Sequence, residues 1–467
     1  MSFKPGLRLR YFILELFVCQ ILFAQVSTTT VPEHGAKPVR SSAPREVIHW
    51  LRTAAIPLRT TVPDADSDDM SPVRAVVGNA RIVAMGEATH GTREFFRMKH
   101  RMLRFLVEEM GFTAFAIEAN WPESLAVNDY VLNGKGDPAQ ALAGLYFWTW
   151  NTEEVLDMIR WMRQYYENPA HVRRVQFFGF DMQIARVAVS NVQQYLERVD
   201  PQGYQLATKV LSPLADEPSE QKYPSQRQQL REETAKGLKS LLVLFDQHER
   251  DYAASSSERE WAVARHNLEI VRQAEELYSS RSSSLRDVSF SIRDNFMAEN
   301  VKWTLDHEPT ETKIMLWAHN GHVSTSPSAM GSVLRKMYGH DMVVCGFSFY
   351  QGSFQAVSGL NQRLQDFTVG TAPPDTLDSA LADTGFPFLA IDLRDAPSHG
   401  AVGEWFATPR RTRSIGAVYN PFFPVSTSYF VPIARDTFDV IFFVNQTTPA
   451  RKNPPLPKQR EPDFIRG

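Results

Sequence analysis

The sequence predicts an α/β fold with a mostly parallel central sheet, flanking helices and an inserted helical bundle. Short apolar runs alternate with longer amphipathic ones over most of the chain. Continuous apolar runs of this length are typical of parallel strands covered on both faces. A single long stretch, from Ile184 to about Pro309, lacks any such run. Strand–helix–strand order therefore recurs around one helical interruption.

Seven apolar runs are predicted as buried strands. In chain order they span residues 81–86, 113–118, 174–181, 313–319, 342–349, 388–393 and 439–444. Their spacing leaves room for a helix after most of them, which is the pattern of a sheet with crossover connections.

Three helices are predicted with these strands. The first begins at Thr92, a residue type that favours helix starts, and ends at Gly111, a residue type that favours helix ends. The second spans residues 151–168 and stops before Pro169, because proline disfavours helical backbone in the residue before it. The third spans residues 284–306 and returns the chain from the helical insertion to the sheet.

Composition divides the chain further. A basic start followed by the apolar run Tyr11–Ala24 predicts a signal peptide over residues 1–24, and therefore an exported protein, periplasmic or extracellular. A misplaced start or an uncleaved anchor is the alternative interpretation. The remaining predicted parts are a flexible leader (25–45), the α/β domain (46–183 and 310–446), the helical insertion (184–309) and a disordered Pro-rich tail (447–467).

Charge and cysteine content exclude several classes of protein. The formal net charge of −3 gives no electrostatic basis for a nucleic-acid partner. The apolar run at the start is too short for a comfortable membrane span, so no stable span is expected after signal cleavage. Cleavage would remove Cys19 and leave Cys345 alone, so no intrachain disulfide can form.

Acids and histidines follow four of the predicted strands. They are Glu87 and His90, then Glu118, then Asp181, and finally His319 and His322. Open parallel sheets bind ligands at the carboxyl ends of their strands, and these ends meet at one edge of the sheet. The sequence therefore predicts that Glu87, His90, Glu118 and His319 line one cleft.

The first of these strand ends suggests a chemistry. Gly86 and Gly91 permit a tight turn and a close backbone approach around His90, and the helix from Thr92 offers N–H groups nearby. A histidine flanked by carboxylates has its tautomer fixed and its basicity raised. Such a histidine can act as the general base that deprotonates water.

Other hydrolase classes lack their signatures here. The nearest match to the G-x-S-x-G elbow of serine hydrolases, Gly346–Tyr350, lacks the last glycine. The sequence contains no H-E-x-x-H, C-x-x-C, Walker loop or G-x-G-x-x-G. Zinc stays an alternative, with ligands drawn from His90, His319, His322, Glu87 and Glu118, but no standard zinc spacing is present, so we expect neither a metal nor another cofactor.

Five ordered motifs carry a resemblance to a known family. They are "GEATHGTREFF", "FTAFAIEANWPES", "QFFGFDMQ", "SIRDNFMAENVKW" and "KIMLWAHNGHVS". Together, over roughly Val47 to Asn445, they resemble the erythromycin esterase family, which includes macrolide-inactivating esterases and succinoglycan-biosynthesis-like proteins. The resemblance implies an α/β domain with a helical part, and hydrolysis of a macrolide lactone by direct attack of water.

The resemblance also implies roles for particular residues. His90 matches the essential histidine, the general base, and Glu87 matches the neighbouring acid that orients it or the water. Glu118 and His319 match two further catalytic positions. Arg293 would stabilise the oxyanion or hold Glu118, whereas Asp181 and His322 are expected to bind substrate.

The expected function is therefore that of a carboxylic ester hydrolase acting on a small-molecule ester or lactone. A macrolide substrate would make it an antibiotic-resistance enzyme. The alternatives are a metal-dependent hydrolase and a non-catalytic binding or envelope-polysaccharide-biosynthesis protein that uses the same cleft.

Overall fold

The computed structural model describes residues 40–171, 173–215, 218–281 and 286–454. These residues form two compact units. Unit 1 holds the described residues up to 117, residues 126–177 and those from 305 onward, and unit 2 holds residues 118–125 and 178–304. The predicted signal peptide lies outside the described residues.

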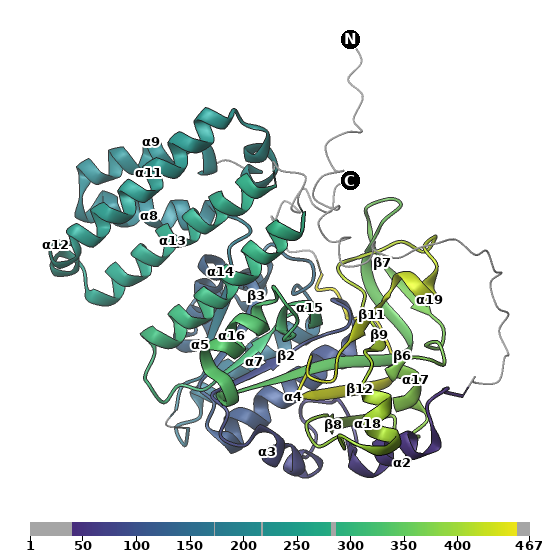
Figure 1. The fold of residues 1–467 in the computed structure, drawn as a ribbon. Helices are drawn as coiled ribbons and strands as arrows, with labels where there is room; N and C mark the ends of the chain where they lie inside the picture. The colour runs from purple at the N-terminus through teal and green to yellow at the C-terminus, as the bar shows by residue number, and fades with distance from the viewer. Residues whose placement is uncertain (1–39, 172, 216–217, 282–285, 455–467) are drawn as a thin grey trace. The chain divides into compact units, whose positions relative to one another are not determined.

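A sheet of ten strands among the described residues forms the core of the fold (Figure 1). Its strands are β1 (Ile56–Pro57), β2 (Ile82–Met85), β3 (Ala114–Asn120), β4 (Gln176–Asp181), β5 (Ile314–Trp317), β6 (Met342–Ser358), β7 (Leu364–Val369), β8 (Phe388–Asp392), β10 (Val418–Tyr419) and β12 (Val440–Thr447). Their order is β1-β8-β12-β6-β2-β5-β3-β4, with β7 and β10 also paired to β6. All seven predicted strands are present.

The central strands of this sheet are parallel, as predicted. β2 lies between β5 and β6, with Met85 opposite Trp317 on one side and Cys345 on the other. β5 also pairs in parallel with β3, and β6 with β12. Because β2 and β5 end in register, the residues that follow Met85 and Trp317 emerge at the same edge of the sheet.

Helices cover this sheet on both faces (Figure 1). Those of unit 1 are α2 (Arg45–Ala54), α3 (Ser71–Val77), α4 (Arg93–Met110), α6 (Pro138–Ala143), α7 (Glu153–Glu167), α15 (Asn320–Val323), α16 (Met330–Tyr338), α17 (Leu377–Ala382), α18 (Gly400–Phe406) and α19 (Val425–Ser428), with the 3-10 turns η2 (Asp68–Met70) and η4 (Gly339–Asp341). Two helices, α5 (Trp121–Asn133) and α14 (Arg286–His307), cross the division between the units. The α/β fold class is confirmed.

Unit 2 contains a bundle of helices. They are α8 (Arg186–Val199), α9 (Pro201–Ala215), α10 (Ser219–Lys222), α11 (Gln228–Gln247), α12 (Glu249–Ser255) and α13 (Glu258–Ser280), with the 3-10 turn η3 (Tyr223–Ser225). In Figure 1, α8, α9, α11 and α13 lie side by side, and α8 packs on both α9 and α13. The helical spacing of Leu238, Leu241 and Phe245 has its physical basis here, since all three are buried.

The sequence analysis missed a second, smaller sheet. It pairs β9 (Arg410–Arg413) with β11 (Phe430–Ile433) in antiparallel register. β9 consists of three arginines and one threonine, so it carries no apolar run that could signal a strand. β6 also continues nine residues beyond its predicted end, because its second half forms an antiparallel hairpin with β7.

The predicted ends of the folded region need correction. The flexible leader was expected to reach residue 45, but Ser41 and Ser42 donate backbone hydrogen bonds to Asp383 and Pro374. The disordered tail was expected from residue 447, but residues 447–454 are ordered, since their N–H groups find acceptors within the fold, such as Gly91. Both predictions are wrong for these residues, while the rest of the leader and tail lies outside the described residues.

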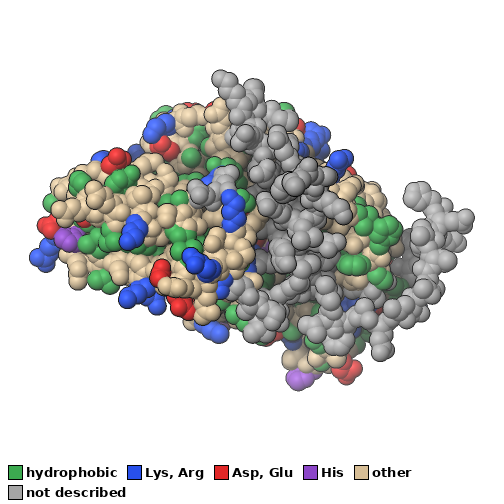
Figure 2. Space-filling view, turned by 90° about the horizontal axis from the view of Figure 1, so that it is seen from above, with side chains coloured by type: hydrophobic (Ala, Val, Ile, Leu, Met, Phe, Trp, Pro, Cys, Tyr) green, Lys and Arg blue, Asp and Glu red, His purple; other side chains and the backbone are tan. Residues whose placement is uncertain are grey.

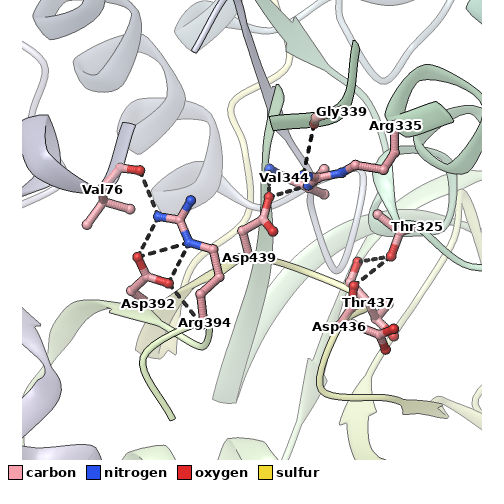
Figure 3. A network of polar contacts seen from close by, with 10 residues as sticks. All are labelled: Val76, Thr325, Arg335, Gly339, Val344, Asp392, Arg394, Asp436, Thr437 and Asp439. Atoms are coloured by element: carbon pink, nitrogen blue, oxygen red, sulfur yellow. Dashed lines mark hydrogen bonds and ion pairs between the residues drawn. The ribbon is translucent and has the colours of Figure 1, made fainter. Parts of the chain in front are cut away.

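The amino-terminal edge of the parallel strands carries a polar network (Figure 3). Asp439, just before β12, accepts a hydrogen bond of 2.8 Å from the Val344 N–H of β6 and pairs with Arg335. Arg394 binds Asp392 and donates to the Val76 carbonyl oxygen. These contacts join strands to neighbouring segments, so we interpret the network as structural.

The described surface carries charges of both signs. On the face shown in Figure 2, basic and acidic side chains are interspersed, in line with the small formal net charge. Among the described residues, no helix combines the length and the apolar character needed to cross a membrane.

Candidate active site

The turn between β2 and α4 is built around two glycines. A Cβ atom on Gly86 would lie 2.1 Å from the Asn320 Oδ1 atom, and one on Gly91 would lie 2.0 Å from the Gln355 carbonyl oxygen. Neither position can hold a larger residue without moving its neighbour. The close backbone approach predicted from the sequence is therefore present at both glycines.

Glu87 lies at the centre of a buried hydrogen-bond cluster. Its Oε1 atom is 2.7 Å from His90 Nδ1, and its Oε2 atom accepts hydrogen bonds from Lys99 Nζ at 2.6 Å and Trp317 Nε1 at 2.8 Å. The side chains of Glu87 and Lys99 are fully buried. A carboxylate with this many donors is fixed in position.

The surroundings of Glu87 also decide its charge. Burial raises the pKa of the Glu87 carboxyl, but the charges and hydrogen bonds of Lys99 and His90 outweigh burial and lower the pKa below its ordinary value. Glu87 is therefore an anion at neutral pH, and the buried Lys99 ammonium is compensated by it.

The hydrogen bonds of the two histidines define their tautomers. Because Glu87 is ionised, His90 donates through Nδ1–H, and its Nε2 atom is then the proton acceptor of the neutral ring. His319 Nδ1 accepts from the Gly321 N–H at 3.1 Å, so a neutral His319 carries its proton on Nε2. The two ring centroids are 5.0 Å apart. The ring with the free proton acceptor and the ring with the Nε2 proton therefore lie next to each other.

Aromatic rings enclose this cluster. The Trp150 ring meets His90 edge-on at a centroid distance of 6.0 Å and packs against Trp317 at 5.6 Å. Lys99 Nζ lies 4.3 Å from the centroid of the Trp317 ring, which adds a cation–π interaction to its ion pair. These rings keep water away from the Glu87 carboxylate and so strengthen its contacts.

Asn320 fixes the second loop of the site. Its amide donates to the Phe347 carbonyl oxygen at 2.7 Å and accepts from the Phe347 N–H at 3.0 Å. Its own N–H donates to the Glu87 carbonyl oxygen at 2.9 Å. Asn320 therefore ties the loop that carries His319 to strand β6 and to the turn that carries His90.

A separate charged cluster lies within unit 2. Arg293 Nη2 donates to Glu118 Oε1 at 2.7 Å and to Asp181 Oδ2 at 2.6 Å. Burial opposes the charged form of Arg293, but the two carboxylates raise its pKa above the ordinary value. Arg293 thus holds the side chains of Glu118 and Asp181 in place.

The structure places the predicted residues in two groups. Glu87, His90 and His319 meet in unit 1, so the expected proximity of the two histidines is confirmed. His322 lies buried in α15, with its N–H bonded to the His319 carbonyl oxygen. Glu118, Asp181 and Arg293 meet in unit 2. A single cleft shared by the two groups and the catalytic roles stay predictions.

The structure also shows what the first N–H of α4 and the serine of the incomplete elbow motif contact. The first N–H of α4, that of Arg93, is not available to a ligand because it donates to the Thr448 carbonyl oxygen. Ser348, the serine of the incomplete elbow motif, is fully buried and donates to Asp378. Within the described residues, no group of three or more acidic, histidine or cysteine side chains is arranged to hold a metal ion.

Sequence reasoning missed four residues of the cluster, namely Lys99, Trp150, Trp317 and Asn320. Lys99 lies on α4 between Met98 and Met102, two residues of its apolar face, and a lysine in such a place usually extends to solvent. One signal was available for Asn320, since it stands between His319 and a glycine at the end of a buried strand.

Comparisons with known proteins identify relatives in sequence and in fold. The chain is 23% identical to an erythromycin esterase type II of Escherichia coli over 387 residues, which cover 74% of this chain and 89% of that protein. It is similar to a solved protein of Bacillus cereus, with 28% identity, a TM-score of 0.77 and coverage of 88% and 99% of the two chains. An erythromycin esterase mutant solved in its open conformation shares the fold, with 18% identity, a TM-score of 0.65 and coverage of 83% and 96%.

A family model settles the relationship. The model described as erythromycin esterase matches residues 107–447, a span that contains Glu118, Asp181, Arg293, His319 and His322. Glu87 and His90 lie just upstream of the matched span, and their cluster includes Trp317 from within it. The chain belongs to the erythromycin esterase family, whose members are esterase-like hydrolases.

Proposed function

We propose that this protein hydrolyses a carboxylic ester or lactone by activating water with His90. The observation that carries the proposal is the hydrogen bond of 2.7 Å between Glu87 Oε1 and His90 Nδ1, which directs the basic Nε2 atom away from the buried carboxylate. Family membership supports the hydrolase class.

The reaction proceeds in two steps. A water molecule bonded to His90 Nε2 loses a proton to the ring while its oxygen attacks the ester carbonyl carbon. The resulting imidazolium is stabilised by the Glu87 anion, with which it shares the Nδ1 proton. The tetrahedral intermediate then collapses, the alkoxide takes the proton from His90, and the products are a carboxylic acid and an alcohol.

The negative charge that develops on the carbonyl oxygen in the tetrahedral intermediate needs a hydrogen-bond donor. His319 supplies one, because its Nδ1 atom is occupied by the Gly321 N–H and its proton therefore lies on Nε2. Removing a single oxyanion donor typically costs about 10²–10³ in kcat. In unit 2, Arg293 holds the carboxylates of Glu118 and Asp181 through hydrogen bonds, and we assign Asp181 to substrate binding.

We infer the substrate class from the proposed reaction. Direct water attack suits an ester whose leaving group is an alkoxide, and a lactone is such an ester. One relative is named an erythromycin esterase, so a macrolide lactone, and with it a role in antibiotic resistance, is the first substrate to test.

The test compares His90→Ala with wild type on chromogenic esters and a macrolide lactone. General-base help is worth about 10²–10⁴ in rate, so the variant should lose at least about a hundredfold in kcat. His340→Ala, the same change at an exposed position, is the matched control and should keep full activity. Equal activity of His90→Ala and wild type would refute the proposal.

Two further assays separate the mechanisms. Chelator treatment should leave activity intact, whereas loss on chelation and recovery with zinc would identify a metal-dependent hydrolase. Serine-directed acylating reagents should label no stoichiometric site.

We also propose that the protein is exported after cleavage near Gln25, because a basic start and an apolar run precede the folded region. N-terminal sequencing of the native protein tests this, and an intact Met1 on cytoplasmic protein would contradict it.

A further inference from the structure

The segment Thr448–Asn453, here called the C-terminal strap, follows β12 directly and lies beyond the span that the family model matches. One half of it contacts the turn that carries His90. The Ala450 N–H donates to the Gly91 carbonyl oxygen at 2.9 Å, and the Arg93 N–H donates to the Thr448 carbonyl oxygen at 3.0 Å. The Thr448 hydroxyl and N–H also donate to Glu94, at 2.6 and 2.7 Å.

The other half of the strap contacts the segment that carries Trp150. The Glu153 N–H donates to the Arg451 carbonyl oxygen at 2.8 Å, and the Arg451 N–H donates to Glu154 at 3.0 Å. Asn453 is buried, and its N–H and side-chain amide donate to the backbone and side-chain oxygens of Asn151, at 3.2 and 3.0 Å. Antiparallel bridges, Thr92 to Pro449 and Thr152 to Lys452, accompany both sets of contacts.

The strap therefore joins two segments whose side chains meet at the base. Trp150 lies one residue before Asn151 and presents its ring edge-on to His90. Gly91 follows His90 directly. A chain segment bonded to both flanks fixes the distance and the angle between the indole and the imidazole, because backbone hydrogen bonds tolerate little displacement.

We propose that the C-terminal strap is a positioning element for His90 that acts by holding Trp150 against the imidazole ring. The proposal rests on the proposed function of His90. With the strap in place, Trp150 restricts the motion of the ring and shields the Glu87–His90 hydrogen bond from water. When the strap is loosened, the indole withdraws and His90 becomes more mobile and more accessible.

The experiment uses Asn453→Ala, which removes the buried amide bond to Asn151. Gln446→Ala is the matched control, since it removes an amide from an exposed position just before the strap. On a chromogenic p-nitrophenyl ester we expect Asn453→Ala to lower kcat about tenfold with little change in KM, and Gln446→Ala to match wild type. Asn151→Asp keeps the acceptor oxygen for Asn453 and should keep most of the activity.

A second readout needs no substrate. Diethyl pyrocarbonate modifies accessible imidazoles, and peptide mapping by mass spectrometry reports the rate at each histidine. Asn453→Ala should raise the rate at His90 several-fold and leave the rate at His340 unchanged. The same increase is expected in Trp150→Leu, and adding Asn453→Ala to Trp150→Leu should raise the rate no further.

The outcomes distinguish the two proposals. An unchanged rate of His90 modification in Asn453→Ala, or additive effects in the double variant, would overturn the strap proposal even where His90→Ala abolishes hydrolysis. Retained hydrolysis in His90→Ala would instead overturn the proposed function, while faster modification of His90 in Asn453→Ala would still support the positioning contact. Circular dichroism on every variant excludes global unfolding as the cause.

Discussion

Two buried glutamates, one in each unit, differ in their charge. Glu87 in unit 1 and Glu123 in unit 2 are both withdrawn from water. The pKa of Glu87 is lowered below its ordinary value, whereas burial raises the pKa of Glu123 to about 8. At neutral pH, Glu87 is therefore an anion and Glu123 a neutral acid.

The difference comes from the partners of each carboxyl. Glu87 receives hydrogen bonds from Lys99, His90 and Trp317. Neither oxygen of Glu123 makes a hydrogen bond of good geometry to a described residue, and the nearby Asp181 opposes the help that Arg186 gives. At Glu123 burial thus outweighs the groups that favour the anion, whereas at Glu87 Lys99 and His90 together outweigh burial.

The largest expected effect tests the anion directly. In Glu87→Gln the side chain keeps its shape but loses its charge, so the imidazolium formed during water attack loses its stabilising partner and the buried Lys99 ammonium loses the carboxylate that pairs with it. We expect kcat to fall at least about a hundredfold and the free energy of unfolding to fall by about 3–5 kcal/mol. Ester hydrolysis and urea unfolding measure the two.

A second substitution separates the two losses. Adding Lys99→Met to Glu87→Gln removes the buried ammonium that has lost its carboxylate, so stability should recover while activity stays low. If stability and activity both recover, Glu87 acts only on stability. If neither recovers, Glu87 does not serve to compensate the buried charge of Lys99.

A smaller effect is expected for Lys99→Met alone. Without the ammonium, the pKa of Glu87 rises, because the largest group that opposes burial is gone. Activity that depends on the Glu87 anion is present above the pKa of that carboxyl and lost as the pH falls through it. The acidic limb of the pH–kcat profile should therefore move to higher pH, with a loss of about tenfold near pH 6 and a smaller one at pH 8. An unshifted limb would show that Lys99 does not set the charge of Glu87.

The sequence predicted the helices and strands that have a periodic pattern of apolar residues or a continuous apolar run. The seven buried strands and the helix from Arg93 to Met110 follow from such patterns, and Gly111 ends that helix with a φ of 74°. The hairpin strand β7 was missed because its residues alternate between half-buried and exposed and contain no long apolar run. The strap was assigned to a disordered tail because its composition is polar and Pro-rich, whereas its order comes from distant acceptors such as Gly91 and Asn151.

Only those site residues that stand in a recognisable local motif could be predicted from the sequence. Glu87 and His90 are visible because a strand ends in a glycine-flanked acid and histidine. Lys99 and Trp150 are not, since their roles depend on which side chains tertiary packing brings to Glu87 and His90. That Glu87 is charged and Glu123 is neutral could not be read from the sequence either, because the difference comes from the partners of the two residues.

The smallest effect concerns Glu123 and appears in stability. The folded-state pKa of about 8 lies above the ordinary value of 4.5, so the folded chain binds the proton more tightly than the unfolded chain. The stability that this proton contributes is fully present below about pH 4.5 and is lost as the pH rises toward 8.

Glu123→Gln mimics the protonated form at every pH. The variant and wild type should therefore melt at similar temperatures at pH 4, where the carboxyl is protonated in the folded and in the unfolded chain, and the variant should melt several degrees higher at pH 9, since one pKa unit is worth about 1.4 kcal/mol. Differential scanning calorimetry at both pH values measures this, with Glu197→Gln, an exposed change on α8, as the control without a pH-dependent gain. A wild type that keeps or gains stability from pH 4 to pH 9 relative to Glu123→Gln would show that Glu123 is an anion like Glu87, and the contrast between the two carboxyls would then be wrong.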